Sequence, residues 1–424
     1  MTMKRILIIS PHFPPSNLTG VHRARLFANH LHEFGWEPIV LMVDEKYYEE
    51  TPDHDLVKLL PADLRIEKSS AFPVTRPRVI GDLGLRAFFQ LYKKAKAIIR
   101  REKIDFLYIP IPSFYISLLG RWLHRSAGIP YGIDYIDPWV HQFPGSHKAF
   151  SRAKVSTMIA KFLEPIAVKK ASLITGVAEG YFNGVLTRNP HLRETCMTGA
   201  MPYGGEKMDH EKVAGIGKTP YLFQRKPGKR LLIYAGTLLP RAYQPLEAIM
   251  QALADEPEEY RDLEIHFIGS GKTPDDPEGY NVRPMAEKYG LWNTLIFEYP
   301  RRIPYLDVLI HLEAADGIFI LGSTEPHYTP SKVYQGVLAG KPILAVLHKA
   351  STAVAILRDS GAGVVLAFDG EKPEEIRGEW RPVYEQYIAF CTAYSPRQIN
   401  TAAYEQFSAT EVTRQLADLL DRIV

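Results

Sequence analysis

Short apolar runs alternate with amphipathic segments along the whole chain of 424 residues. In the first half the predicted buried strands are Ile6–Ser10, Ile39–Val43, Phe106–Ile109, Tyr131–Tyr135, Leu173–Gly176 and about Cys196–Thr198. In the second half they are Leu231–Ala235, Glu264–Ile268, Leu295–Glu298, Gly317–Leu321, Ile343–Val346 and Gly363–Leu366. Helical patterns fill most gaps, which is typical of parallel α/β sheets with right-handed crossovers. We therefore predict two Rossmann-like domains of six strands each.

The domain boundaries follow from a change in pattern near the middle of the chain. Segment 204–229 is polar and glycine-rich and has no sustained period, so we expect it to be a linker. It separates an N-terminal domain at 1–203 from a C-terminal domain that begins at 230. A chain of this length is long enough to build two hydrophobic cores.

Composition indicates an ordinary globular enzyme, with 46% apolar and 23% charged residues. The two cysteines, Cys196 and Cys391, lie far apart in sequence, so we expect no disulfide framework and a reducing compartment. The apolar run Ile6–Ile9 is too short for a signal peptide, and no run approaches the length of a membrane span. These features favour a cytoplasmic protein.

Positive charge is concentrated in the first half of the chain. Residues 1–200 hold 27 Lys and Arg against 18 Asp and Glu, although the whole chain has a net charge of only +3. The basic stretch Arg76–Lys103 is interpreted as an amphipathic helix packed on the sheet with solvated lysines, and a patch for an anionic membrane is the alternative. A second stretch, Lys148–Lys170, carries an apolar stripe, and we expect it to touch an anionic membrane peripherally. No nucleic-acid-reading module is visible, so no nucleic acid partner is expected.

The segment Glu325–Val346 is the most informative part of the sequence. Thr329 is placed to cap a helix and Pro330 to occupy its first position. Ser331 and Lys332 would then lie in the first turn, where free backbone N–H groups and the helix dipole attract anions. A cation at this end disfavours the helix but favours phosphate. The segment therefore suggests a phosphorylated ligand.

Loops after the other strands supply further candidates, because ligands of parallel sheets bind beyond the carboxyl ends of the strands. After the first strand, Gly20 would let the backbone approach a ligand, with His22, Arg23 and Arg25 adding positive charge nearby; an ordinary βα turn with a solvated basic face explains these residues equally. The absence of G-x-G-x-x-G here disfavours a dinucleotide cofactor.

Asp137, at the end of the fourth predicted strand, is placed either to orient or deprotonate a hydroxyl or to cap a helix. In the second half, Gly236 and Thr237 begin a loop whose backbone would meet a phosphate, and Arg241 would pair with it; a solvated arginine is the alternative. In Phe297–Tyr305 the tyrosine and arginines would flank a base, although as an isolated signal this is mostly turn chemistry.

Other short motifs in the sequence do not indicate a metal site or a catalytic nucleophile. Asp53 and Asp55 imitate a metal-binding D-x-D, but they lie in a charged stretch without an apolar strand, so we expect them to be solvated. There is no H-E-x-x-H or G-x-S-x-G, and neither cysteine has a partner motif. A metal site and a catalytic nucleophile are therefore not expected.

Together these motifs resemble the retaining glycosyltransferases of family 4, which have the GT-B fold. The matching runs are ILIISPHFPP, TGVHRARLFANHLHEFGWEPIVL, PYGGE, YAGTL, FIGSG, TPSKVYQGVLAGKPILA and FSATEVTRQLADLLDRIV. They cover nearly the whole chain in the family's order. The run SKVYQGVLAGKPILA resembles the branch that acts on cell-surface polysaccharide and lipid-linked acceptors. The resemblance implies two domains facing a cleft, a C-terminal domain at 230–400 and a terminal helix at 401–424 that crosses back to the N-terminal domain.

The resemblance also implies roles for particular residues. The donor diphosphate would be held by Lys332, with Arg241 as the second cation. Gly20 would border the diphosphate and Asp137 would lie near the acceptor. The donor-binding set would be Gly20, Gly236, Thr237, Tyr299, Glu325, His327, Tyr328, Thr329, Pro330, Ser331 and Gln335. The chain departs from the family at its pair of glutamates, where His327 and Gln335 stand instead; Gln335 can still hydrogen-bond a ribose.

The activity implied is transfer of a hexosyl or N-acetylhexosaminyl group from a nucleotide-diphosphate sugar, with retention and without a metal or other cofactor. The acceptor would be a cell-surface glycan or a lipid-linked molecule, with the enzyme in the cytoplasm or on the inner face of the membrane. A GT-B nucleotide-sugar epimerase and a catalytically silent nucleotide-sugar-binding protein are the alternatives.

Overall fold

The computed structural model describes residues 3–75, 77–78, 80–140, 151–326 and 328–424. The chain forms two compact units. Unit 1 consists of Met1–Gly204 and Ala409–Val424, and unit 2 consists of Gly205–Ser408. The chain therefore leaves unit 1 once and returns to it with its last residues.

Unit 1 is built on a parallel sheet of seven strands in the order β3-β2-β1-β4-β5-β6-β7. The strands are β1 (Lys4–Ile9), β2 (Trp36–Val43), β3 (Arg65–Ser69), β4 (Phe106–Ile111), β5 (Tyr131–Tyr135), β6 (Leu173–Gly176) and β7 (Met197–Ala200). The pattern predicted six of them and missed β3. This edge strand reads RIEKS and is mostly half-exposed, so it carries no apolar run.

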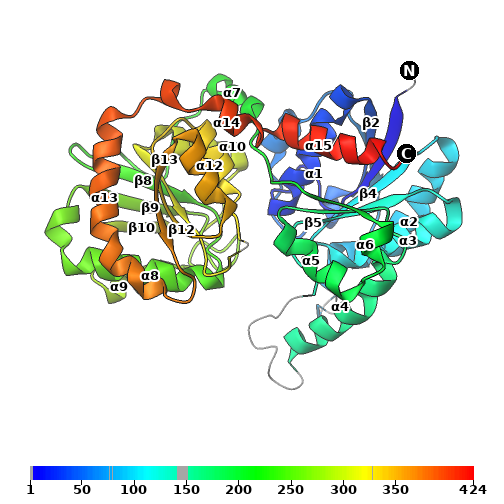
Figure 1. The fold of residues 1–424 in the computed structure, drawn as a ribbon, viewed down its shortest axis with the longest axis horizontal. Helices are drawn as coiled ribbons and strands as arrows, with labels where there is room; N and C mark the ends of the chain where they lie inside the picture. Colours follow the sequence, from blue (N-terminus) through cyan, green and yellow to red (C-terminus); the bar gives the residue numbers. More distant parts are fainter. Residues whose placement is uncertain (1–2, 76, 79, 141–150, 327) are drawn as a thin grey trace. The chain divides into compact units, whose positions relative to one another are not determined.

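Helices cover both faces of this sheet. They are α1 (Thr19–His30), α2 (Leu83–Arg101), α3 (Ser117–Ala127), α4 (Arg152–Val168), α5 (Glu179–Arg188), α6 (Leu192–Thr195) and α15 (Ala409–Asp421). Alternate residues of β1 enter two different cores, because Leu7 and Ile9 face α2 while Ile6 and Ile8 face α1 and α15. Figure 1 shows the last helix, α15, beside α1, against which it packs.

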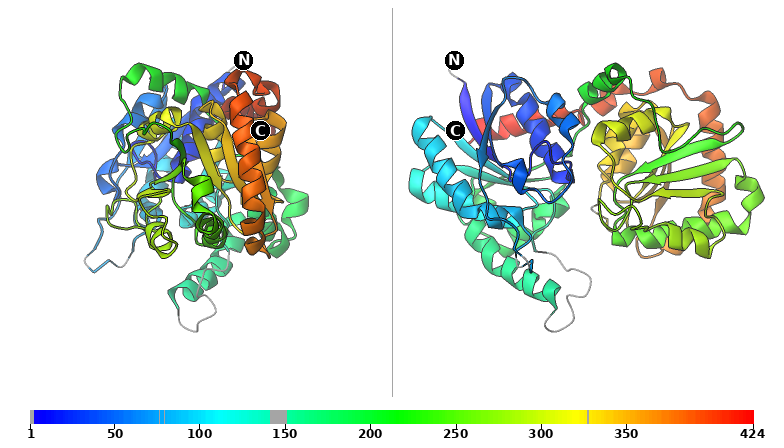
Figure 2. Two further views of the ribbon diagram at one scale, coloured as in Figure 1. Left: turned by 90° about the vertical axis from the view of Figure 1, so that its left-hand side faces the viewer. Right: turned by 180° about the vertical axis from the view of Figure 1, so that it is seen from behind.

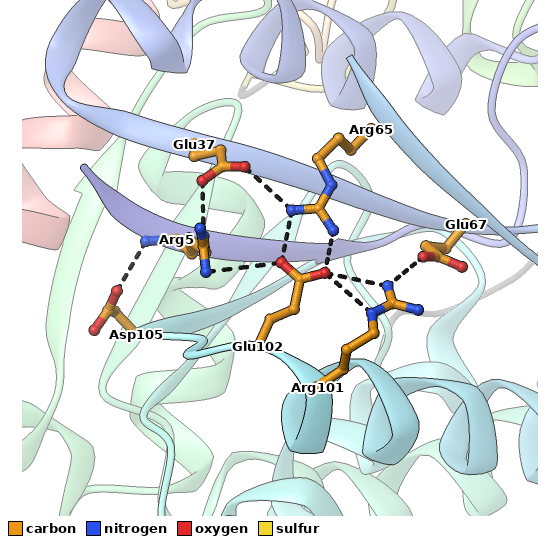
Figure 3. Close-up of polar contacts among 7 residues, drawn as sticks. All are labelled: Arg5, Glu37, Arg65, Glu67, Arg101, Glu102 and Asp105. Carbon is orange, nitrogen blue, oxygen red and sulfur yellow. Dashed lines mark hydrogen bonds and ion pairs between the residues drawn. The ribbon is translucent and has the colours of Figure 1, made fainter. Parts of the chain in front are cut away.

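A network of charges joins the amino ends of the first strands of unit 1 (Figure 3). Glu102, just after α2, pairs with Arg65 of β3 and lies 3.8 Å from Arg5 of β1. Glu37 of β2 accepts a hydrogen bond from Arg5 at 2.7 Å and one from Arg65 at 3.2 Å. The network ties three strands to the end of a helix at the edge opposite the carboxyl ends.

Unit 2 is built on a parallel sheet of six strands in the order β10-β9-β8-β11-β12-β13. They are β8 (Arg230–Ala235), β9 (Leu263–Ile268), β10 (Ile296–Tyr299), β11 (Gly317–Leu321), β12 (Ile343–His348) and β13 (Gly363–Phe368). All six were predicted from the apolar runs, within one or two residues at most ends. The inner strands β8, β9, β11 and β12 are buried on both faces, which makes their signal strong.

The helices of unit 2 are α7 (Lys207–Ile216), α8 (Tyr243–Asp255), α9 (Arg283–Lys288), α10 (Tyr305–Ala314), α11 (Lys332–Leu338), α12 (Thr352–Ser360), α13 (Ile376–Ala393) and α14 (Thr401–Glu405). Figure 2 shows helices on both faces of this sheet. The segment expected to be a linker without regular structure contains α7, whose Val213 and Asp209 are buried. Tyr305 donates a hydrogen bond to Asp209 at 2.8 Å, which holds α7 against α10.

The strand orders confirm the prediction of two parallel α/β sheets. In each sheet the order reverses once, between β1 and β4 in unit 1 and between β8 and β11 in unit 2. Loops diverge at such a reversal and leave a crevice at the carboxyl ends of the strands. No helix in the described part of the chain is long and apolar enough to cross a membrane.

Candidate functional site

The candidate site of unit 2 lies where the sheet order reverses. The loop that begins at Gly236 follows β8, and the loop 322–331 follows β11, so the two leave neighbouring strands at the same edge. A backbone hydrogen bond from Thr324 to Arg241, 3.1 Å long, ties these loops together. Most residues predicted to bind the donor are therefore brought to one edge, although they are about ninety positions apart in sequence.

Lys332 is the central cation of this site. It is the first residue of α11 and is half-buried. Its Nζ lies 4.7 Å from the centroid of the Tyr234 ring, near the end of β8. Tyr234 is fully buried, and its hydroxyl donates to the carbonyl of Thr237 at 3.0 Å. The ring is thus a fixed platform that attracts the ammonium group by a cation–π interaction.

Electrostatics around Lys332 favour an anion. Among the described residues no carboxylate lies within ion-pair distance of its Nζ. Burial, together with a smaller effect of the nearby charge of Arg302, lowers the pKa of Lys332 to about 8. Arg302 follows β10 and donates to the Thr237 hydroxyl at 3.4 Å. A diphosphate would bring negative charge to the place where these two cations meet.

Gly236 lies directly against Lys332. Its φ of +114° belongs to a region that other residues rarely adopt. A Cβ at this position would stand 2.7 Å from Cε of Lys332, closer than real contacts allow. Glycine therefore both permits the turn after β8 and leaves room for the lysine side chain.

Arg241 and Glu325, both predicted to contact the donor, contact each other. Arg241 Nη1 lies 3.6 Å from Glu325 Oε1, and the arginine side chain is 59% exposed. An exposed pair of this length contributes little to stability, so either partner can exchange the other for a ligand. Thr237, in the same loop, is exposed apart from its contact with Arg302.

The start of α11 differs from the prediction. The helix begins at Lys332, and Ser331 precedes it without a capping hydrogen bond. Thr329 was expected to cap the helix, but its hydroxyl shares a 2.6 Å hydrogen bond with that of Thr352, at the start of α12. Thr329 is buried, and Pro330 precedes the helix instead of opening it.

The other residues predicted to contact the donor bond to neighbouring protein groups in this structure or lie outside the described residues. The carbonyl of Tyr328 accepts a hydrogen bond from Ser351 at 2.8 Å, which fixes this part of the loop. Gln335 accepts one from His210 of α7 at 2.9 Å, and the other ring nitrogen of His210 lies 3.0 Å from Glu313. His327 lies outside the described residues.

Tyr299 ends β10 and lies against β9. Its ring is stacked on His266 with centroids 5.8 Å apart, and its hydroxyl is 3.3 Å from His266 Nδ1. Phe297 stacks on the same histidine at 4.5 Å. These contacts give Tyr299 a packing role in the sheet, in addition to any contact with a base.

In unit 1 the predicted residues also reach the carboxyl edge of the sheet. Gly20 packs close to Pro112, after β4, where a Cβ would stand 2.8 Å from the proline Cδ. Asp137 is exposed in the bend after β5. The pKa of Tyr203 is raised mainly by burial and, to a smaller extent, by the negative charge of Asp137. The ordinary alternative, a helix cap, does not apply to Asp137, since the three residues that follow it, 138–140, are not helical.

Two sequence interpretations in unit 1 are wrong. Arg23 was expected to add charge near a ligand, but it is fully buried and pairs with buried Asp134 at 2.5 Å. Thr175 donates to the same carboxylate at 2.7 Å, so the acid and arginine form a closed internal network. Arg25 is likewise buried. Asp53 was expected to be solvated, but it is buried. Its carboxylate accepts a hydrogen bond from the backbone N–H of Asp55 and so caps the short 3-10 helix His54–Leu59.

Sequence reasoning missed two contributors to the site. The sequence pattern places Tyr234 inside a strand and Arg302 in a loop that would flank a base. Both reach Lys332 or Thr237 because β8, β9 and β10 are adjacent in the sheet. In the sequence, the only available signal was that each residue lies at or beyond the carboxyl end of a predicted strand. In the described part of the chain, no group of three or more His, Cys, Asp and Glu residues is placed to hold a metal ion.

Comparisons with known proteins identify the architecture. No model of a known protein family matches the chain, and no curated protein matches it. Solved structures do match. Sucrose-phosphate synthase from Thermosynechococcus elongatus has a TM-score of 0.65 at 12% identity, covering 99% of this chain and 98% of that one. HepE from Anabaena in complex with UDP-glucose has a TM-score of 0.60 at 15% identity, covering 99% of both chains.

Trehalose 6-phosphate synthase from Burkholderia multivorans has a TM-score of 0.63 at 13% identity and covers 99% of both chains. At such low identity these similarities concern the fold alone. They agree with an architecture of two parallel sheets over the whole chain. The chain therefore has the α/β architecture of the GT-B fold.

Proposed function

We propose that the protein is a glycosyltransferase that takes a sugar from a nucleotide-diphosphate donor. The observation that carries the proposal is Lys332, a half-buried cation without a carboxylate partner among the described residues, held on Tyr234 beside Gly236. HepE, which shares the fold, is described in complex with UDP-glucose. A diphosphate would match the charge at the loops after β8 and β11, which leave the sheet where ligands of parallel sheets bind.

The residues of this site would act on the leaving group. Lys332 and Arg302 would neutralise charge that develops on the diphosphate as the bond to the sugar breaks. Arg241 would join them by exchanging Glu325 for a phosphate oxygen. Backbone amides of Tyr328–Ser331 and the side chain of Gln335 are candidates for the sugar and ribose hydroxyls. No metal is required in this scheme, and the anomeric configuration would be retained, as in the family that the sequence resembles.

Unit 1 would bind the acceptor, with Asp137 near its reacting hydroxyl. An exposed acid directly after a central strand can orient such a hydroxyl or accept its proton. The acceptor would be a cell-surface glycan or a lipid-linked molecule, and the sugar transferred a hexosyl or N-acetylhexosaminyl group.

The test is donor binding and turnover with Lys332→Ala. Isothermal titration with UDP and UDP-glucose measures binding, and release of UDP measures slow donor hydrolysis. One lost charge-assisted contact should weaken binding by roughly 10- to 100-fold. Lys372→Ala, an exposed lysine of the same unit, is the matched control and should bind normally.

Other outcomes would favour the alternatives. Isomerisation of the nucleotide sugar in the absence of any acceptor would indicate an epimerase. Tight binding without hydrolysis or transfer would indicate a silent binding protein. Unchanged affinity in Lys332→Ala, with the fold intact by circular dichroism, would exclude this lysine from the donor site and remove the basis of the proposal.

A lipid-linked acceptor would require contact with a membrane, and α4 is the element that suits it. One face of α4 packs on the core, but its other apolar face is exposed, with Phe162 71% and Met158 62% accessible. Figures 1 and 2 show α4 projecting from unit 1. Exposed lysines flank the apolar face at Lys154, Lys161, Lys169 and Lys170. We expect insertion of this face at the inner surface of an anionic bilayer, with about 1 kcal/mol from each lysine.

The surface beside α4 strengthens this expectation. A hollow of about 430 Å³ between α3 and α4 is lined by Arg121, Arg125 and Lys169, together with Trp122 and Ile166. Three cations with an aromatic ring suit a lipid phosphate at the headgroup level. The basic helix α2, in contrast, buries Leu91, Ala95 and Ile98 in the core, as its ordinary interpretation predicted.

Sedimentation with phosphatidylglycerol vesicles tests the membrane contact. Wild-type protein should sediment at low salt and be released at high salt, whereas Met158→Ser with Phe162→Ser should remain in the supernatant. Met208→Ser changes a methionine of unit 2 that is 52% exposed and should leave sedimentation unchanged. Equal sedimentation of the α4 variant and wild type would rule out this face as the contact.

A further inference from the structure

A second cavity lies at the amino edge of the unit 2 sheet, opposite the candidate donor site. Its volume is about 640 Å³. The walls are formed by residues at or just before the starts of β8, β9, β11 and β12 and by the end of α13 and the residues after it. Ligands of parallel sheets normally bind at the carboxyl edge, so the strand arrangement does not explain this cavity as part of the donor site.

The cavity carries an excess of positive charge. Arg225, Lys229, Arg230 and Lys341 line it, against Asp262 and Asp316. Asp316 is already occupied, because it pairs with Arg225 and accepts a 2.9 Å hydrogen bond from the backbone of Leu231. Asp262 lies 4.0 Å from Arg261 on an exposed surface. The acids therefore do not balance the remaining cations.

Three cations at the cavity are available to a ligand. Lys229, Arg230 and Lys341 are each half-buried, and among the described residues none has a carboxylate within ion-pair distance. Lys229 donates to the carbonyl of Arg261, an acceptor without net charge. An anion that enters the cavity would therefore meet cations that no carboxylate already neutralises.

Tyr394 supplies a second, independent observation. It lines the same cavity, and its hydroxyl is buried without a hydrogen-bond partner among the described residues. Buried hydroxyls are nearly always paired in folded proteins, so an orphaned one beside a cavity indicates a missing acceptor or donor. A phosphate oxygen would satisfy it, and so would a sugar hydroxyl.

We propose that this cavity binds a phosphate-bearing small molecule of about the size of a sugar phosphate. The phosphate would be held by Lys341 and Arg230, with the Tyr394 hydroxyl bonding to the ligand. The site is independent of the donor site, since every wall residue lies at the opposite edge of the sheet. It is connected to that site by α11, which begins at Lys332 and is followed by Gly340 and Lys341.

Cys391 provides a reporter of occupancy. It lines the cavity and is half-buried, and burial raises the pKa of its thiol. Cys196, the other cysteine of the chain, lies in unit 1 and serves as an internal reference. Alkylation by iodoacetamide, followed peptide by peptide with mass spectrometry, reports the two thiols separately. A bound anion should shield Cys391 and disfavour its thiolate, and both effects slow the reaction.

The experiment titrates inorganic phosphate and glucose 1-phosphate against the alkylation rate, with ionic strength held constant by chloride. We expect saturable slowing at Cys391 and none at Cys196. Lys341→Met should raise the half-protecting concentration by about tenfold, the loss of one charge-assisted contact. Tyr394→Phe should raise it less. Lys93→Met, an exposed lysine of unit 1, is the charge-matched control and should behave as wild type.

Three outcomes would overturn the inference. They are no slowing at Cys391, equal slowing at both cysteines, and protection that is unchanged in both Lys341→Met and Tyr394→Phe. Lys332→Ala separates this site from the donor site, because it should weaken donor binding by roughly 10- to 100-fold and leave protection of Cys391 intact. Thermal unfolding of each variant establishes that it is folded before alkylation is compared.

Discussion

The ammonium group of Lys332 lies 4.7 Å from the centre of the buried Tyr234 ring, and the two residues belong to elements nearly one hundred positions apart. The ring restrains a side chain that would otherwise have many rotamers, so a ligand loses less entropy when it binds. Burial of the lysine without a carboxylate also shifts its titration toward physiological pH. The buried environment beside Tyr234 therefore fixes both where the Lys332 ammonium group lies and the pH at which it loses its proton.

We expect donor affinity to depend on pH through Lys332. Its pKa is lowered to about 8 from an ordinary value of 10.5. Below pH 8 the lysine is already charged, and above it binding of a diphosphate must take up a proton. Affinity should therefore fall by up to about tenfold for each pH unit above 8. Titration calorimetry in buffers of different ionisation enthalpy measures the proton uptake directly.

Lys332→Arg is the control for this pH dependence. An arginine stays charged throughout this range, so its affinity should be nearly independent of pH. The same shift predicts that the free energy of unfolding of the wild type rises between pH 8 and 10.5, since the unfolded chain binds the proton more tightly. A pH-independent affinity in the wild type would contradict the assignment of this lysine to the diphosphate.

Gly236→Ala should impair donor binding more than folding. The new Cβ would displace the Lys332 side chain, and the φ of +114° would cost about 1–3 kcal/mol. Gly361→Ala is a matched control, because its φ is +65° and no atom lies within 4 Å of the place that its new methyl group would occupy. Both variants should lose stability by urea unfolding, but only Gly236→Ala should also lose affinity for UDP.

Asp134→Asn and Asp137→Asn should separate stability from activity. Asp134 is fully buried with Arg23, and removal of its charge leaves a buried arginine unpaired at a cost of about 3–5 kcal/mol. Asp137 is exposed three residues later, so its substitution should leave unfolding unchanged. If Asp137 assists the acceptor, Asp137→Asn should lower transfer while donor hydrolysis continues. Large destabilisation by Asp137→Asn would show that its role is structural.

Acid should weaken unit 1 through Glu50. Burial alone would raise its pKa, but hydrogen bonds from His12 and Ser16 and the charge of His12 lower it to about 2. The stabilisation is present above about pH 4.5 and is lost as pH falls through about 2, and it amounts to roughly 3 kcal/mol. Urea unfolding across this range should show the loss in wild type and a flatter dependence in Glu50→Gln.

Much of the fold was predictable from the sequence, because buried parallel strands leave unmistakable apolar runs. All strands of unit 2 and six of unit 1 were found in this way. The edge strand β3 was not, since its residues, RIEKS, are mostly half-exposed and form no apolar run. The helix α7 was missed because only part of one face is buried, and the start of α11 was misplaced because Thr329 bonds to Thr352 instead of capping.

The sequence by itself determined the two α/β units, the cation at the start of α11 and the glycine after β8, since each depends on local pattern. Only the tertiary structure decided which residues meet. Strand order brings Tyr234 and Arg302 to Lys332, and it buries Arg23 against Asp134 instead of exposing it. It also creates the cationic cavity around Lys341. The physical reason is that a periodic pattern specifies which face of an element is buried, whereas the neighbours of that face depend on pairing between distant strands.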